Sequence, residues 1–159
     1  MPRLPSLLVA LLLLVPSVAS AQVQPGQSFA ARIVEVTDGD TFDAQRSDGQ
    51  TFTIRLHGVD APESAQPYGT IATRKARQYV QGSRVRVSVE DVGRYGRAVA
   101  RITVQGGDLG AMLIRDGLAW YYREYAPGES EYDRLQTQAR RAVRGLWAQA
   151  NPVPPWAWR

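Results

Sequence analysis

Hydrophobic and polar residues alternate in several stretches of the first two thirds of the chain, which is the pattern of half-buried β-strands. The alternation is clearest at 84–90, where Arg and Ser interleave with Val. Turn signals separate the stretches, among them Ser47-Asp48-Gly49. The sequence therefore predicts five strands in meander order, at 29–36, 41–45, 51–59, 84–90 and 98–104.

Three other segments have the residue pattern of helices. We expect them at 67–81, 108–115 and 131–144. Asp108 is placed to cap the second helix, and Ser130 with Asp133 forms a capping pair for the third. The tail at 151–159 contains three prolines, so we expect no helix there.

This order of elements places one helix after the third strand and the others after the fifth. It predicts an α+β protein: an OB-fold five-stranded β-barrel with about three packed helices. OB-folds often bind nucleic acids or oligosaccharides. The fold alone, however, does not give the function.

The N-terminal segment has the pattern of a secretory signal peptide. Residues 4–18 are nearly all apolar or small, Arg3 precedes them, and Ala19 and Ala21 are small residues at the cleavage positions. The apolar run is short for a membrane span, so we expect a secreted or periplasmic protein with no stable membrane anchor. An uncleaved N-terminal anchor is the alternative. The expected organisation is a signal peptide at 1–21, a polar leader at 22–27, one domain at 28–150 and a Pro- and Trp-rich tail at 151–159.

The amino-acid composition excludes several kinds of site and modification. The chain has no cysteine, which excludes disulfides and a cysteine-linked lipid anchor. His57 is the single histidine, so neither a zinc cluster nor a serine hydrolase is supported. Lys75 is the single lysine among 19 basic residues. Arginine suits two-pronged contact with phosphate, but a genome biased towards arginine codons explains most of this skew.

Three short motifs place carboxylates and arginines where hydrolysis of a phosphodiester needs them. They are Asp38-Gly39-Asp40-Thr41, Arg55-Leu56-His57-Gly58-Val59-Asp60-Ala61-Pro62-Glu63 and Arg94-Tyr95-Gly96-Arg97. The middle motif crosses the end of a predicted strand, and Pro62 forces a turn after it. An arginine, a metal-binding carboxylate and a base at one rim suit attack on a phosphate.

These motifs, in this order and followed by Gly-Leu-Ala-Trp at 117–120, resemble the thermonuclease (staphylococcal-nuclease-like) family over about residues 28–159. The resemblance implies a calcium-dependent phosphodiesterase that acts on DNA and RNA. It also implies cleavage of the 5′ P–O bond, which leaves 3′-phosphate ends. We expect a monomer that prefers single-stranded or frayed substrate, because the site must reach around the backbone.

The resemblance also implies a role for particular residues. The calcium ligands would be Asp40, Asp60 and the backbone carbonyl of Ala61. The catalytic residues would be Arg55 and Arg97, which grip the phosphate, and Glu63, which activates water. The substrate contacts would be Arg94, Tyr95 and Tyr125. One departure from the family pattern is Gly93, which stands where an acidic residue is common.

Simpler interpretations of the same residues stay open. Asp38 and Asp40 are also typical turn residues, and an isolated glutamate such as Glu63 usually forms a surface ion pair. Trp120 and Tyr121 suit core packing at least as well as base stacking. At the level of function, a non-catalytic OB-fold nucleic-acid-binding module is the main alternative. An oligosaccharide-binding protein also fits the fold, but it leaves the paired arginines unexplained.

We expect the mature protein to begin at Gln22, because Ala19 and Ala21 are small enough for signal peptidase. The intact mass of protein exported by a bacterial host checks this prediction. A mass that retains Met1 would contradict it.

Overall fold

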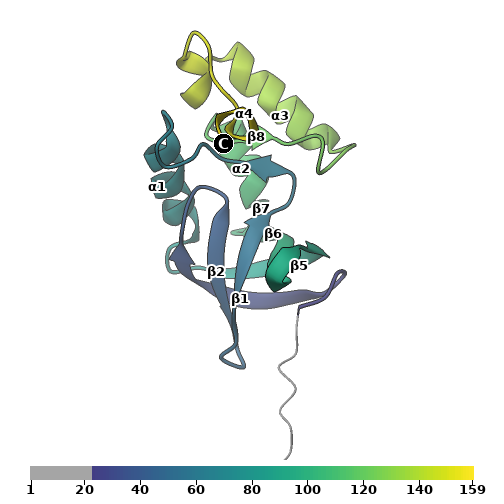
Figure 1. The fold of residues 1–159 in the computed structure, drawn as a ribbon. Coiled ribbons are helices and arrows are strands. Elements are labelled where there is room, and N and C mark those ends of the chain that lie inside the picture. Colours follow the sequence, from purple (N-terminus) through teal and green to yellow (C-terminus); the bar gives the residue numbers. More distant parts are fainter. Residues whose placement is uncertain (1–22) are drawn as a thin grey trace, which may run out of the picture.

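The structure is a computed structural model that describes residues 23–159, so the expected signal peptide at 1–21 lies outside the described residues. Its centre is a β-barrel (Figure 1). The barrel strands are β1 (Ser28–Val36), β2 (Thr41–Arg46), β3 (Thr51–Leu56), β5 (Arg84–Val92) and β6 (Ala98–Val104). Neighbours pair antiparallel in the order β3-β2-β1-β5-β6, and β3 then pairs with β6 in parallel and closes the barrel. The predicted α+β barrel is confirmed.

The third predicted strand is wrong in its length. Instead of one strand over 51–59, the chain turns at Gly58, whose φ of 66° is a value that other residues rarely adopt. A short strand, β4 (Val59–Asp60), follows the turn and pairs with β8 (Trp120–Tyr121) outside the barrel. Because of this turn, Asp60 lies at the rim of the barrel and not in its wall.

The three expected helices are present as α1 (Gly69–Val80), α2 (Leu109–Arg115) and α3 (Ser130–Arg141). A two-residue strand, β7 (Gly107–Asp108), leads into α2. The predicted cap of α2 is confirmed, because the Asp108 carboxylate accepts a hydrogen bond from the Ala111 amide at 2.8 Å. Helices α1, α2 and α3 lie together at one end of the barrel (Figure 1).

Two predictions for α3 are wrong. The N-cap residue is Glu129, and no side chain caps the helix; the Asp133 carboxylate pairs with Arg123 instead. The helix also ends before residue 144, because Val143 has a φ of 54° and breaks the helical path. A 3₁₀ turn at Gly145–Ala148 then leads into the tail.

The prediction that the tail contains no helix is also wrong. A one-turn helix, α4 (Pro155–Trp158), begins at the last of the three prolines. Pro155 occupies its first position, where the missing N–H removes no hydrogen bond and the fixed φ favours the helix. The prolines thus set where this helix begins.

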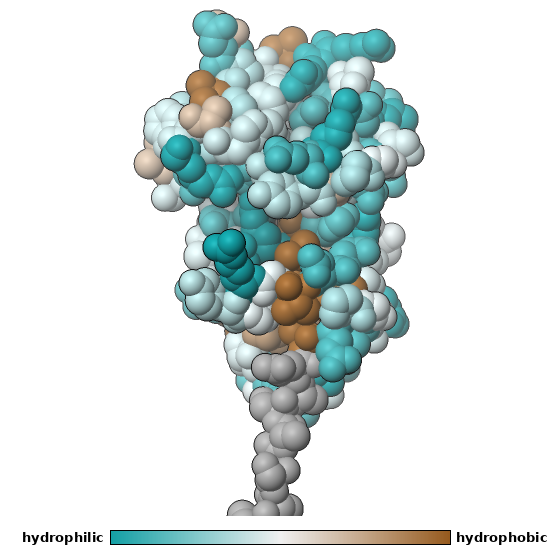
Figure 2. Space-filling model, turned by 45° about the vertical axis from the view of Figure 1, so that its right-hand side comes forward, coloured by the Kyte–Doolittle hydropathy of each residue, from teal (hydrophilic) through white to brown (hydrophobic). Residues whose placement is uncertain are grey.

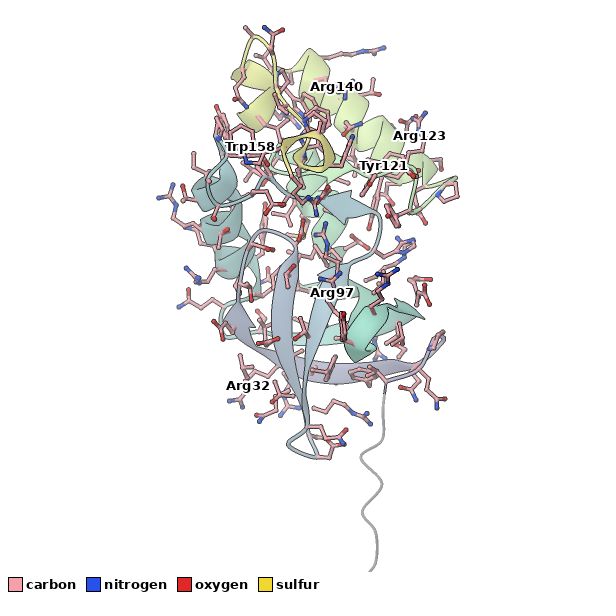
Figure 3. All side chains as sticks on the ribbon, viewed as in Figure 1. Arg32, Arg97, Tyr121, Arg123, Arg140 and Trp158 are labelled. Atoms are coloured by element: carbon pink, nitrogen blue, oxygen red, sulfur yellow. The ribbon has the colours of Figure 1, made fainter. Side chains whose placement is uncertain are left out.

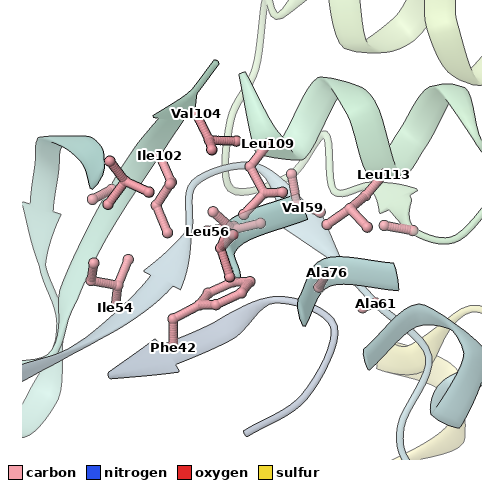
Figure 4. Packing of buried hydrophobic residues seen from close by; sticks show 14 of the residues in the cluster. Phe42, Ile54, Leu56, Val59, Ala61, Ala76, Ile102, Val104, Leu109 and Leu113 are labelled. Carbon is pink, nitrogen blue, oxygen red and sulfur yellow. The ribbon is translucent and has the colours of Figure 1, made fainter. Parts of the chain in front are cut away.

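The core joins the inside of the barrel to α2 and α1 (Figure 4). Phe42 and Ile54 from the barrel are fully buried, as are Leu109 and Leu113, which lie one turn apart on the same face of α2. Ala72 and Ala76 are fully buried residues of α1, and their small side chains let this helix pack close to the barrel. The barrel end towards the helices is therefore rigidly packed.

The surface is largely polar on the face shown in Figure 2, where hydrophobic residues appear mainly as a narrow band over the lower half. Among residues 23–159, every helix is too short or too polar to cross a bilayer.

Substitution of Gly69 by Ala should destabilise the protein. A Cβ at this position would overlap the backbone carbonyl of Glu63, so the loop before α1 must move. We expect a loss of about 1–3 kcal/mol in the free energy of unfolding, measured by denaturant titration. Gly93→Ala is the control, because its φ is −75° and its Cβ would meet nothing closer than 3.6 Å. Equal stabilities of the two variants would contradict this account.

Candidate active site

A buried arginine lies between two buried carboxylates at the rim of the barrel. The β2–β3 ladder pairs Thr41 with Arg55, which brings the preceding residue, Asp40, beside the guanidinium. Arg55 Nη1 contacts Asp40 Oδ1, and Arg55 Nη2 lies 2.5 Å from Asp60 Oδ1. Two of the three sequence motifs therefore meet at Arg55.

Burial sets the electrostatics of this cluster. Asp40 and Asp60 are 4% and 1% exposed. Burial lowers the pKa of the Arg55 guanidinium from its usual value, while the charge and hydrogen bond of Asp60 oppose this shift. Each charge would cost several kcal/mol if it were buried without a partner. The cluster is stable only as a set.

Asp38 and Asp40 have different roles in the turn between β1 and β2. The Asp38 carboxylate accepts a hydrogen bond from the Asp40 amide at 3.0 Å, which is the usual behaviour of a turn residue. The Asp40 carboxylate instead reaches across to the second motif, where Oδ2 accepts from the Ala61 amide at 2.5 Å. The turn interpretation therefore fits Asp38, and Asp40 belongs to the cluster.

Glu63 follows the cluster on a loop that the tail holds in place. Its amide donates to Gln66 Oε1 at 2.8 Å, and Gln66 Nε2 donates to the Val153 carbonyl at 3.2 Å. The Glu63 carboxylate lies 3.2 Å from Arg159 Nε, and Arg159 Nη2 lies 2.5 Å from Asp60 Oδ2. Arg159 thereby links Glu63 to the buried cluster.

An open cavity of about 760 Å³ lies against the cluster. Its lining includes two of the predicted arginines, three aromatic residues and Arg159: Arg55, Arg97, Tyr122, Tyr125, Trp156 and Arg159. Arg97 is exposed, and no acidic side chain among residues 23–159 forms an ion pair with it. In Figure 3, Arg97 lies near the strands of the barrel, while Trp158 lies higher in the view, at the end of α4.

Two predicted substrate contacts are absent from the lining of this cavity, although Gly93 and Arg97 on either side of them belong to it. Arg94 and Tyr95 are exposed in a 3₁₀ turn at Arg94–Gly96, and neither lines the cavity. Tyr95 has a φ of 63°, in the left-handed region that residues other than glycine rarely adopt. Tyr125, in contrast, lines the cavity and is 70% exposed.

The neighbouring aromatic residues pack inside the protein. Trp120 and Tyr121 are buried, as the packing interpretation expects. The ring of Trp120 lies edge-on to that of Trp147 at 4.3 Å, and the Arg140 guanidinium covers both rings. His57 faces Glu129, with Nε2 at 3.7 Å from Oε1, which fits a structural role.

The cluster offers oxygen atoms to a cation. Asp40 and Asp60 supply carboxylates and Ala61 supplies a carbonyl, which are the hard donors that calcium prefers. Within residues 23–159, no group of three or more His, Cys, Asp or Glu side chains is arranged to hold a metal ion. A cation here would therefore need water or substrate to complete its ligands, and it would have to share carboxylate oxygens that Arg55, Arg159 and the Ala61 amide contact in this structure.

Sequence reasoning missed Arg159, Trp156 and Gln66. The first two stand in Pro-Trp-Ala-Trp-Arg at the end of the chain, where two tryptophans and an arginine among prolines are an unusual composition. That composition was the available signal. Nothing in the sequence places the tail beside Asp60, and Gln66 carries no motif.

Comparison with known proteins gives a consistent result. The family described as staphylococcal nuclease homologue matches residues 53–149. A protein of Escherichia coli O157:H7 described as an uncharacterized endonuclease is 39% identical over 129 residues, covering 80% of this chain and 83% of that protein. A micrococcal nuclease of Shigella flexneri is 34% identical over 141 residues, with 82% and 80% covered. The family match spans more than half of the chain, and the chain therefore belongs to the staphylococcal nuclease family.

Proposed function

We propose that this member of the staphylococcal nuclease family is a secreted or periplasmic, calcium-dependent nuclease that hydrolyses DNA and RNA. It cleaves the 5′ P–O bond and leaves 3′-phosphate ends. The observation that carries the proposal is the buried cluster of Asp40, Arg55 and Asp60, which Arg159 links to Glu63; Arg55 and Arg159 also line the open cavity. Export follows from the signal-peptide pattern at 1–21.

In this proposal Asp40, Asp60 and the Ala61 carbonyl hold the calcium ion. A bound calcium ion would offset the negative charge of the phosphate under attack. The sequence alone leads us to expect that the two carboxylates repel each other when no cation is present. Arg55 changes that expectation, because its guanidinium lies between them and compensates their charge.

Arg55 and Arg97 have different roles in binding the phosphate. Arg55 already contacts two carboxylates, so it orders the cluster and offers only its remaining edge to the substrate. Arg97 has no acidic partner among the described residues and lines the cavity, so its planar fork can hold two phosphate oxygens. One such donor is worth about 3–4 kcal/mol in the transition state.

Glu63 is the proton acceptor in this proposal. It is the carboxylate of the site that is partly open to solvent, whereas Asp40 and Asp60 are buried. A water molecule beside it can lose its proton to the carboxylate while the oxygen attacks phosphorus in line. Arg159 contacts Glu63 and limits the directions in which the carboxylate can point.

The substrate is an unpaired strand of DNA or RNA, bound by a monomer. Tyr125 and Tyr122 line the same cavity as Arg55 and Arg97, and their rings contact each other edge-on at 4.6 Å. Exposed aromatic rings beside arginines stack on bases of any sequence, provided that the bases are unpaired. Duplex ends that fray supply such bases.

The alternative is a nucleic-acid-binding module without catalysis. Its expected signature is the loss of Glu63, Arg55 or Arg97, and all three residues are present. A cleavage assay of residues 22–159 on labelled single-stranded DNA, with calcium and with a chelator, separates the two functions. Binding without cleavage in calcium would favour the module.

Removal of calcium should abolish cleavage, because the phosphate then lacks its cation. Calcium should also raise the melting temperature of the wild type, since binding at 100 times the dissociation constant adds about 2.7 kcal/mol of stability. Asp40→Asn should lose this shift, while Asp48→Asn, at the hairpin tip, should keep it. Equal cleavage in calcium and in chelator, or equal melting shifts in both variants, would overturn the assignment of calcium.

Arg97→Lys should lower kcat about 100-fold, because an ammonium group cannot make two parallel hydrogen bonds to the phosphate. Arg84→Lys is the control on the exposed surface of the barrel, and we expect its kcat to stay close to that of the wild type because Arg84 lies outside the cavity lining. Steady-state kinetics on a short single-stranded oligonucleotide measures both. Similar kcat values for the two variants would remove Arg97 from the transition state.

A further inference from the structure

The last turn of the chain forms one wall of the cavity. Trp156 and Arg159 are three residues apart on and just after α4, so they lie on the same face of that turn. Both line the cavity that Arg55 and Arg97 line from the barrel side. The C-terminal end lies close to α2 and β8 in Figure 1, beside the rim of the barrel.

Trp156 continues the aromatic surface of Tyr122 and Tyr125. Its ring is stacked on Tyr122, with the centroids 4.6 Å apart and the planes at 12°. It also meets Trp120 edge-on at 5.6 Å, yet it stays 39% exposed. The ring is thus positioned by two aromatic neighbours and remains partly exposed to solvent.

Arg159 brings a third guanidinium to the cavity. Its Nη2 and Nε face Asp60 and Glu63, at 2.5 Å and 3.2 Å. Its Nη1 makes no hydrogen bond to any of the residues 23–159, and half of the side chain is exposed. These contacts orient the guanidinium, and its free edge remains available to an anion.

The tail is attached to the domain by contacts of its own. Gln66 donates a hydrogen bond to the Val153 carbonyl, and Pro155 is buried. Trp158 packs on the other side of the tail, in a small pocket that includes Pro62 and Trp120. Trp156 and Arg159 therefore face the cavity from a fixed support.

We propose that Trp156 and Arg159 of the tail form part of the substrate-binding site. Trp156 stacks on an unpaired base next to the cleaved phosphodiester, and Arg159 contacts a phosphate of the same strand. This inference rests on the proposed nuclease function and adds a base contact and a phosphate contact to it. The ligand class is single-stranded nucleic acid, because a paired base has no free face for Trp156.

A tail that blocks the site is the opposite reading of the same contacts. The cavity argues against it, because about 760 Å³ stays open while the tail is in place. That volume lies within the range of pockets that hold small ligands, about 300–1,000 Å³. Trp156 and Arg159 thus form a wall of the cavity and leave its interior open.

The test for Trp156 compares two strands of equal length, oligothymidylate and an abasic strand, as substrates in calcium. Trp156→Leu keeps the apolar bulk and removes the stacking face, so we expect KM for oligothymidylate to rise about tenfold. KM for the abasic strand should stay unchanged. Trp156→Phe should retain most of the wild-type affinity, and Trp158→Leu is the control from the other side of the tail.

The test for Arg159 uses the salt dependence of KM. Arg159→Gln should raise KM for both strands and should lower the slope of log KM against log salt by about 0.7, the value of one phosphate contact on a single strand. Arg134→Gln removes the same charge from α3 and should change neither quantity. Trp156→Leu should leave the slope unchanged.

The outcomes separate this inference from the proposed function. A wild type that cleaves normally, together with a Trp156→Leu variant of unchanged or lower KM, would overturn the tail contact while the nuclease function stands. A fall of KM in Arg159→Gln would mean that the tail covers the site. A wild type that does not cleave at all would overturn the function, and anisotropy of the labelled strands in chelator would then test the tail by binding alone.

Discussion

The rest of the site depends on one buried charge, the Arg55 guanidinium between Asp40 and Asp60. None of these groups tolerates burial alone, so each exists where it does because the others are present. The arrangement also requires the register of β2 against β3, since a slip by one residue would turn Arg55 to the other face of the strand. The pairing of β2 with β3 therefore determines where the charged groups of the rim lie. The ion pairs of Arg55 in turn favour this register of the two strands.

How far the sequence predicts this structure depends on how local each feature is. Alternation located the barrel strands, and the motif from Arg55 to Glu63 located most of the cluster, because residues close in sequence share one strand end. The sequence did not predict the helical turn that begins at Pro155 or the end of α3 at Arg141, because contacts with neighbouring segments determine both. The role of Trp156 was not predicted, because its ring contacts Tyr122 only when the tail packs against the domain.

The arginine-rich composition has no single explanation. Arg55 uses the shape of its guanidinium by contacting two carboxylates at once, and Arg101 does so with Glu90 and Glu129. A lysine could not replace either one. Arg32 and Arg84, by contrast, are exposed on the barrel, where any solvated cation would serve (Arg32 is labelled in Figure 3). Specific contacts explain particular arginines. The remaining exposed arginines are explained by the bias of the genome towards arginine codons.

The Arg159–Asp60 pair joins residues that are 99 positions apart, and this separation has a consequence for biosynthesis. A ribosome that adds about 5–20 residues per second delivers Arg159 roughly 5–20 s after Asp60. During that interval Asp60 and Glu63 lack the guanidinium that contacts both of them. All the barrel strands precede Arg159 in the chain, so this ion pair can only be added to a barrel whose strands have already been synthesised.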